Sequence, residues 1–156
     1  MKKLLLLLPF LIISCEKNEV EECIELPVKT IEVFAQIDSQ AVLIQALIQV
    51  ESRGLDSAIG DKHLVGNEAI GALQIRPIMV REVNRILDLQ NMGYEFKLRD
   101  RFDREKSIEM FLIWKNYHHA NDKMEVIARN WNGGPRGYKK DRTIKYWSKV
   151  QQELDI

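Results

Sequence analysis

The sequence predicts a mainly α-helical domain of the α+β type, with about five helices and one small irregular or β-hairpin segment. Apolar residues recur at helical spacing in several segments. Residues that cap helices precede most of these segments, and glycine or proline lies between them. Because about 120 residues remain once the N-terminal segment is set aside, the chain is long enough for one hydrophobic core.

The first predicted helix covers residues 40–52, with Asp38 or Ser39 as its N-cap. Four residues share one face of this helix at the i, i+3, i+4, i+7 spacing: Ile44, Leu47, Ile48 and Glu51. Gly54 suits the left-handed position that ends a helix. The pattern therefore directs a single carboxylate toward an apolar interior from the last turn of the helix.

Residues 55–70 contain two glycines and no steady period, so they are predicted as a long loop that can hold a small hairpin. Loops of this length inside a compact domain are often functional. Residues 90–102 are predicted as a second irregular connection. The remaining predicted helices are residues 77–89 with Pro77 first, residues 104–120 after Asp103, residues 123–131 after Asp122, and residues 144–154 after Asp141 or Thr143.

The chain begins with MKKLLLLLPFLIISC, in which two lysines precede an apolar run and a small residue precedes Cys15. This pattern predicts a secretory signal at residues 1–14, which is too short for a membrane span. The ending LIISC resembles a bacterial lipobox, and this resemblance implies that Cys15 becomes the lipidated first residue of the mature protein. The alternative is an ordinary signal peptide cut near Ser14, which leaves a disulfide between Cys15 and Cys23 open.

Residues 15–37 are predicted as an acidic tether and residues 38–156 as the folded domain. Seven acidic and two basic residues lie between positions 16 and 38, whereas six basic and three acidic residues lie between positions 136 and 156. Removal of the predicted signal takes two lysines from the 23 basic residues, which leaves 21 basic against 23 acidic side chains. This balance gives no argument for nucleic-acid binding.

Three short motifs carry the predicted chemistry: VESRG at residues 50–54, GALQI at residues 71–75 and ARNWNGG at residues 128–134. Together they resemble the lytic transglycosylase branch of the lysozyme-like superfamily. That family has a Glu-Ser pair at the end of a buried helix, then a Gly-x-x-Gln element, and later an Ala-Tyr-Asn-Ala-Gly element. The resemblance covers roughly residues 38–147. The chain departs from it in Trp131 in place of Tyr, in an enlarged loop after the Glu-Ser pair, and in Gly54-Leu55, where the family often has an apolar or aromatic residue.

The resemblance implies a lysozyme-like fold around a glycan cleft, and cleavage of the β-1,4 bond between N-acetylmuramic acid and N-acetylglucosamine in peptidoglycan. It also implies that Glu51 is the one acid and base, and that a hydroxyl of the sugar replaces water to give a 1,6-anhydro product. The residues themselves support Glu51, because a carboxyl in apolar surroundings has a raised pKa and can donate a proton near neutral pH. The alternative is a helix-terminal glutamate that faces solvent or pairs with Arg53.

Five further residues are predicted to contact the substrate: Ser52, Gln74, Trp131, Asn132 and Tyr146. For Ser52 and Gln74 the structural alternative is capping of a helix. For Trp131 it is the hydrophobic core, for Asn132 it is a turn, and for the basic segment around Tyr146 it is a solvated helix face. A hydrolase on this fold would need a second carboxylate, for which three loop residues are candidates: Asp56, Asp61 and Glu68.

The sequence thus predicts an exported monomer, lipid-anchored in the bacterial cell envelope and facing the periplasm, which acts on peptidoglycan without a cofactor. The three histidines have no metal-ligand spacing, so no metal site is predicted. Two alternatives stay open. One is a hydrolytic muramidase on the same fold, and the other is a lipoprotein that binds peptidoglycan without cleaving it.

Overall fold

The computed structural model of the protein describes residues 28–154, with side chains described from Ser39 onward. This part of the chain is mainly helical and contains one two-stranded antiparallel sheet. Its elements are α1 (Val28–Ser52), β1 (Ile59–Gly60), β2 (Ala69–Ile70), α2 (Pro77–Leu89), the 3-10 helix η1 (Leu98–Phe102), α3 (Arg104–His118), α4 (Met124–Gly133), the 3-10 helices η2 (Gly137–Lys139) and η3 (Asp141–Thr143), and α5 (Ile144–Leu154). The predictions of a mainly helical domain and of a small hairpin in the first long loop are confirmed.

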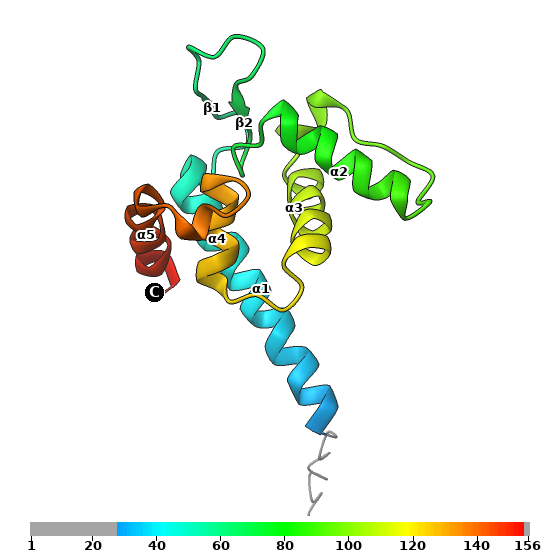
Figure 1. The fold of residues 1–156 in the computed structure, drawn as a ribbon, viewed down its shortest axis with the longest axis vertical. Helices are drawn as coiled ribbons and strands as arrows, with labels where there is room; N and C mark the ends of the chain where they lie inside the picture. Colours follow the sequence, from blue (N-terminus) through cyan, green and yellow to red (C-terminus); the bar gives the residue numbers. More distant parts are fainter. Residues whose placement is uncertain (1–27, 155–156) are drawn as a thin grey trace, which may run out of the picture.

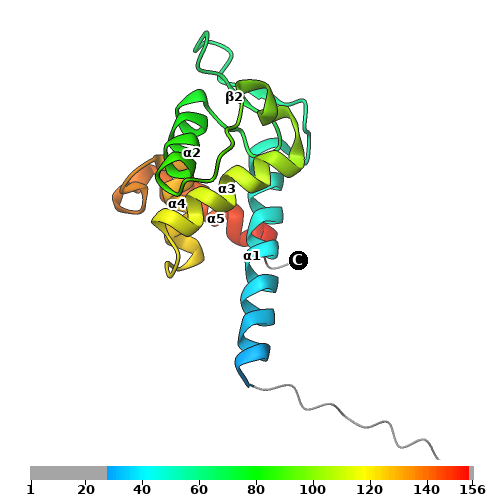
Figure 2. The ribbon, with the colours of Figure 1, turned by 90° about the vertical axis from the view of Figure 1, so that its right-hand side faces the viewer.

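Helix α1 is the central element of the fold (Figure 1). Helix α5 packs along α1, α4 packs against α5, and α2 packs against α3. The β1–β2 hairpin lies beyond the C-terminal end of α1 in both views (Figures 1 and 2), with Ile59 opposite Ile70. The hairpin therefore lies near the end of α1 that carries Glu51, and Tyr146 near the start of α5 reaches the same end.

The hydrophobic core gathers side chains from α1, from the segment after β2, and from α2, α3 and α5. Its fully buried members include Leu47, Ile48, Leu73, Ile75, Val83, Leu87, Met110, Phe111 and Val150. Burying one such side chain stabilises the fold by about 1.5–3 kcal/mol. The predicted apolar face of α1 is confirmed, because Ile44, Leu47 and Ile48 are all buried in this core.

Helix α1 begins earlier than predicted, at Val28, so Asp38 and Ser39 lie inside the helix. The predicted N-cap is therefore wrong, and residues 28–37 of the predicted tether are helical. No glycine or proline occurs between Val28 and Ser52, so no residue in this stretch breaks the helical hydrogen bonding. The first turns of α1 stand clear of the other elements in both views (Figures 1 and 2). The predicted signal, Cys15 and the rest of the predicted tether lie outside the described residues.

The ends of the other helices agree with the predicted capping residues only in part. The Asp103 side chain accepts a hydrogen bond from the Lys106 backbone N–H at 3.1 Å, which confirms it as the N-cap of α3. Asp122 does not cap α4, because its carboxylate bonds to the His119 ring at 2.7 Å and Lys123 takes the N-cap position. Helix α3 ends two residues before its predicted end, and α4 ends two residues after its predicted end. No helix in the part of the chain that the structure describes is long and apolar enough to cross a membrane.

Candidate active site

Glu51 lies in the last turn of α1, where the helix ends as the sequence predicts. The Ser52 hydroxyl donates a hydrogen bond to the Ile48 carbonyl oxygen at 3.1 Å, and only 7% of Ser52 is exposed. Gly54 has a positive φ of 80°, which confirms its predicted left-handed conformation, and Arg53 before it also has a positive φ of 56°. The Ser52 hydroxyl therefore bonds to its own helix, and its predicted contact with substrate stays a prediction.

The Glu51 carboxylate accepts a hydrogen bond from the Tyr146 hydroxyl at 2.7 Å. Burial raises the pKa of Glu51 from 4.5 to about 7, because desolvation disfavours the ionised form. The Tyr146 hydrogen bond and the positive charge of Arg76 lower this pKa, whereas the negative charge of Asp61 raises it. Desolvation is the largest of these effects, so a large fraction of Glu51 is protonated at neutral pH.

Helix α5 brings Tyr146 to Glu51 from 95 positions further along the chain. Helix α5 packs against α1 and is held by Val150, which is fully buried. Burial and the nearby Glu51 charge raise the pKa of the Tyr146 hydroxyl well above its usual range, so Tyr146 stays a hydrogen-bond donor. The predicted contact of Tyr146 with substrate stays a prediction, and its observed contact is with the candidate acid.

Gln74 is the last residue of a tight turn that follows the hairpin. It has a left-handed φ of 50°, and its amide nitrogen donates to the carbonyl oxygens of Ala58 and Gly71 at 3.3 and 3.0 Å. A Cβ at Gly60 would lie 2.2 Å from the Gln74 amide oxygen, so the glycine makes room for this side chain. Gln74 thus joins the hairpin to the GALQI turn and does not cap α2. Its side-chain nitrogen is used in these bonds, so the side-chain oxygen is the atom that remains for the predicted contact with substrate.

Arg101 fixes the hairpin and the GALQI turn to η1. Its guanidinium donates to the carbonyl oxygens of Leu98, Glu68 and Ile75 at 2.7, 3.0 and 3.1 Å. Gly71 packs so closely that an added Cβ would lie 1.8 Å from the Arg101 carbonyl oxygen. These contacts make the position of the loop depend on η1.

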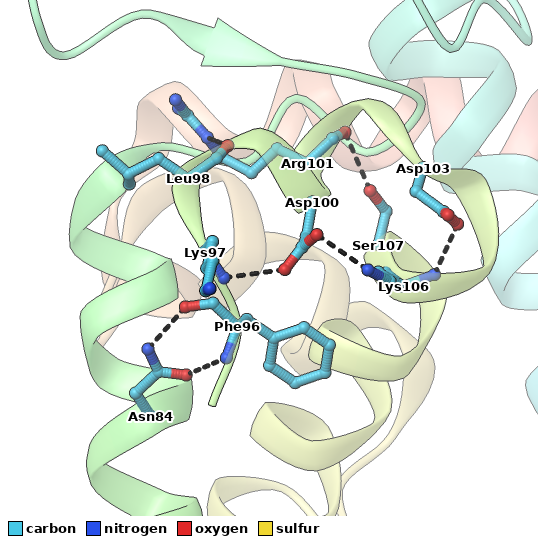
Figure 3. Close-up of polar contacts among 9 residues, drawn as sticks. All are labelled: Asn84, Phe96, Lys97, Leu98, Asp100, Arg101, Asp103, Lys106 and Ser107. Atoms are coloured by element: carbon cyan, nitrogen blue, oxygen red, sulfur yellow. Dashed lines mark hydrogen bonds and ion pairs between the residues drawn. The ribbon is translucent and has the colours of Figure 1, made fainter. Parts of the chain in front are cut away.

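The segment that carries Arg101 is itself held by polar contacts (Figure 3). The Asn84 side chain donates to the Phe96 carbonyl oxygen at 2.8 Å and accepts from the Phe96 N–H at 2.9 Å. The Ser107 hydroxyl donates to the Arg101 carbonyl oxygen at 3.0 Å, and Asp100 accepts from Lys106 and from the backbone N–H of residue 97. The irregular connection predicted for residues 90–102 is therefore tied to both α2 and α3.

The three loop carboxylates have different surroundings. Asp56 pairs with Arg104 at 2.8 Å. Glu68 accepts a hydrogen bond from the Gly66 N–H, and backbone hydrogen bonds lower its pKa. Asp61 pairs with Arg76. Of the three, Asp61 is the one whose charge raises the pKa of Glu51, so it is the best placed candidate for a second carboxylate.

The NWNGG segment contributes to the packing of the core through Trp131. Trp131 is half-buried and packs edge-on against Phe111 and Trp114, with ring centroids 5.0 and 5.1 Å apart, which favours its core alternative. Asn132 is exposed, so its predicted contact with substrate stays a prediction. The buried amide belongs to Asn130, whose side-chain oxygen accepts a hydrogen bond from the Tyr138 N–H at 3.0 Å.

Two arginines near the site were not singled out by sequence reasoning. Arg76 directly follows the GALQI motif, and this position next to a predicted site element could have identified it as a candidate site residue. Arg101 lies in an irregular segment without a motif, and no pattern in the sequence indicates its role. Among the described residues, no group of three or more His, Cys, Asp or Glu side chains could hold a metal ion.

Comparison of the chain with protein-family models, with curated proteins and with solved structures finds no match. A carboxyl with a pKa of about 7 can donate a proton to a leaving oxygen and then, once ionised, accept a proton from an attacking hydroxyl. This arrangement is suited to general acid and base catalysis at one side chain.

Proposed function

We propose that the chain adopts a lysozyme-like fold and is a peptidoglycan lytic transglycosylase that cleaves the β-1,4 bond between N-acetylmuramic acid and N-acetylglucosamine. The observation that carries the proposal is the desolvated Glu51 carboxyl, with its pKa raised to about 7 and its Oε1 held by Tyr146. Its place at the end of a buried helix, followed by GALQI and NWNGG, supports the same function through the resemblance in sequence.

In this reaction Glu51 donates its proton to the glycosidic oxygen, and the bond from that oxygen to C1 of N-acetylmuramic acid breaks. The substrate's own acetamido group supports the cationic centre. The ionised Glu51 then takes the proton of the 6-hydroxyl of the same sugar, whose oxygen bonds to C1. The products are a 1,6-anhydro end and a free N-acetylglucosamine end, no water is consumed, and Glu51 is protonated again.

The experiment is digestion of purified peptidoglycan with the protein, followed by mass spectrometry of the released fragments. Glu51→Gln is expected to abolish release while retaining the circular dichroism and unfolding cooperativity of the folded protein. Asp88→Asn, an exposed carboxylate in α2, is the matched control and should cleave normally. Full activity of Glu51→Gln would overturn the mechanism, and sedimentation with peptidoglycan without any release would support a binding lipoprotein instead.

The second candidate is a hydrolytic muramidase, which the electrostatic influence of Asp61 on Glu51 favours. A hydrolase needs a second carboxylate, and Asp61 would supply it. Reducing ends in the digest, together with loss of activity in Asp61→Asn, would establish the hydrolase. Anhydro ends that persist in Asp61→Asn would establish the transglycosylase.

We also propose that the protein is exported through residues 1–14 and anchored by lipid at Cys15. The support is the sequence alone, because these residues lie outside the described part of the chain. Growth of the expressing bacterium with a labelled fatty acid tests this. The label is expected on the wild-type protein and absent from Cys15→Ser.

A further inference from the structure

A pocket of about 260 Å³ lies between α1, the C-terminal end of α3 and the start of α4. Its apolar lining is formed by Leu43, Phe111, Met124 and Ile127. Leu43 precedes Glu51 by eight residues on α1, or roughly 12 Å along the helix axis. The pocket is therefore separate from the candidate active site, and none of the roles assigned above uses it.

The pocket has two charged groups in its lining, Lys115 and Asp122. Asp122 is already engaged, because its carboxylate bonds to the His119 ring at 2.7 Å. Lys115 forms no ion pair with any described residue, and its Nζ donates one long hydrogen bond of 3.3 Å to Asn116. A lysine ammonium has three donors, so Lys115 retains donors for a further acceptor.

Lys115 is unusual because only 8% of it is exposed. Lysine is almost never this deeply buried without an acidic partner, since an unpaired charge is costly to remove from water. Lys115 is one of the residues that line the pocket. The pocket thus combines an apolar wall with one positive charge that has no acidic partner among the described residues.

From these contacts we infer that the pocket binds a small molecule with a single carboxylate and an apolar body. The carboxylate accepts charge-assisted hydrogen bonds from Lys115, and the apolar body packs against Leu43, Phe111 and Ile127. A single negative charge matches the one cation that lacks an acidic partner. Asp122 in the same lining repels any anion, and it repels a doubly charged phosphate more strongly than a carboxylate. This inference does not depend on the proposed function.

The test is titration of the isotope-labelled full chain with hexanoate, hexanol and hexylamine, monitored by changes in the NMR chemical shifts of its backbone amides. Hexanoate is expected to shift the signals of the pocket residues saturably, and to bind at least about tenfold more tightly than hexylamine or hexanol. Lys115→Met keeps the apolar stem and removes the charge, and it should weaken hexanoate binding by about tenfold. Lys149→Met, an exposed lysine on α5, makes the same change in net charge and should leave the affinity unchanged.

Three results would overturn the inference. They are the absence of saturable shifts at the pocket, equal affinity for hexanoate and hexylamine, and unchanged affinity in Lys115→Met. If Lys115→Met does not fold, the comparison of the three ligands on the wild-type protein decides the question alone. Shifts confined to the basic residues 136–149 would show general attraction of anions and would also contradict the pocket.

Discussion

Replacing Glu51 by glutamine should stabilise the folded protein at high pH and leave its stability unchanged at low pH. Glutamine has the size of glutamate, and its oxygen can still accept the hydrogen bond from Tyr146. Below pH 4.5 the glutamate is protonated in both the folded and the unfolded chain, so a neutral substitute costs little. Above pH 7 the unfolded chain ionises freely, while the folded chain has to hold an ionised carboxylate in a desolvated site.

The size of this effect follows from the pKa shift. The pKa of Glu51 rises from 4.5 to about 7 on folding. Each unit of pKa corresponds to about 1.4 kcal/mol, so the wild-type protein loses up to about 3.5 kcal/mol of unfolding free energy as pH rises through this window. Part of the Glu51 residue is still exposed to solvent, so this value is an upper limit.

Urea unfolding of both proteins between pH 4 and pH 9, followed by circular dichroism, measures the effect. Other titrating groups are present in both proteins, so they cancel in the difference between the two unfolding free energies. The difference is expected to be near zero at pH 4 and to favour Glu51→Gln above pH 7. A difference that does not change with pH would falsify the burial of this carboxyl and, with it, the argument for its catalytic pKa.

Two further changes test the packing and hydrogen bonding around Glu51. Tyr146→Phe removes a hydrogen bond that lowers the pKa of Glu51, so this pKa should rise above about 7. NMR titration of the side-chain carboxyl carbon of Glu51 measures it. An unchanged pKa would contradict the observed bond. Gly71→Ala should destabilise the fold by more than about 3 kcal/mol, because its Cβ would lie 1.8 Å from the Arg101 carbonyl oxygen. Gly93 also has a positive φ, but nothing lies within 4 Å of an added Cβ, so Gly93→Ala should cost only about 1 kcal/mol. Denaturant unfolding measures both values.

Local patterns were enough to predict most of the helices. Pro77 begins α2 and Asp103 caps α3, because each residue acts on the backbone within one turn of itself. The spacing of apolar residues predicted that Glu51 shares the buried face of α1 with Leu47 and Ile48, because this spacing also depends only on nearby residues. The start of α1 was predicted too late, since a possible cap at Asp38 or Ser39 does not stop a helix that nothing else interrupts.

Contacts between distant segments could not be read from these patterns. Tyr146 was singled out as an aromatic residue, but its bond to Glu51 depends on how α5 packs on α1. The same holds for Arg101, which joins three separate backbone carbonyls, and for the pairing of Asp61 with Arg76. No periodicity links such residues, because their separation in the sequence is unrelated to their separation in space.

The sequence by itself determined that one glutamate would lie on an apolar helix face, before a glycine that ends the helix. Only the tertiary structure decided that this glutamate is desolvated enough for a pKa of about 7, and which groups oppose that shift. The physical reason is that helical periodicity is a property of neighbouring residues. The free energy of ionising a carboxyl depends on every element packed around it and on how much water they exclude.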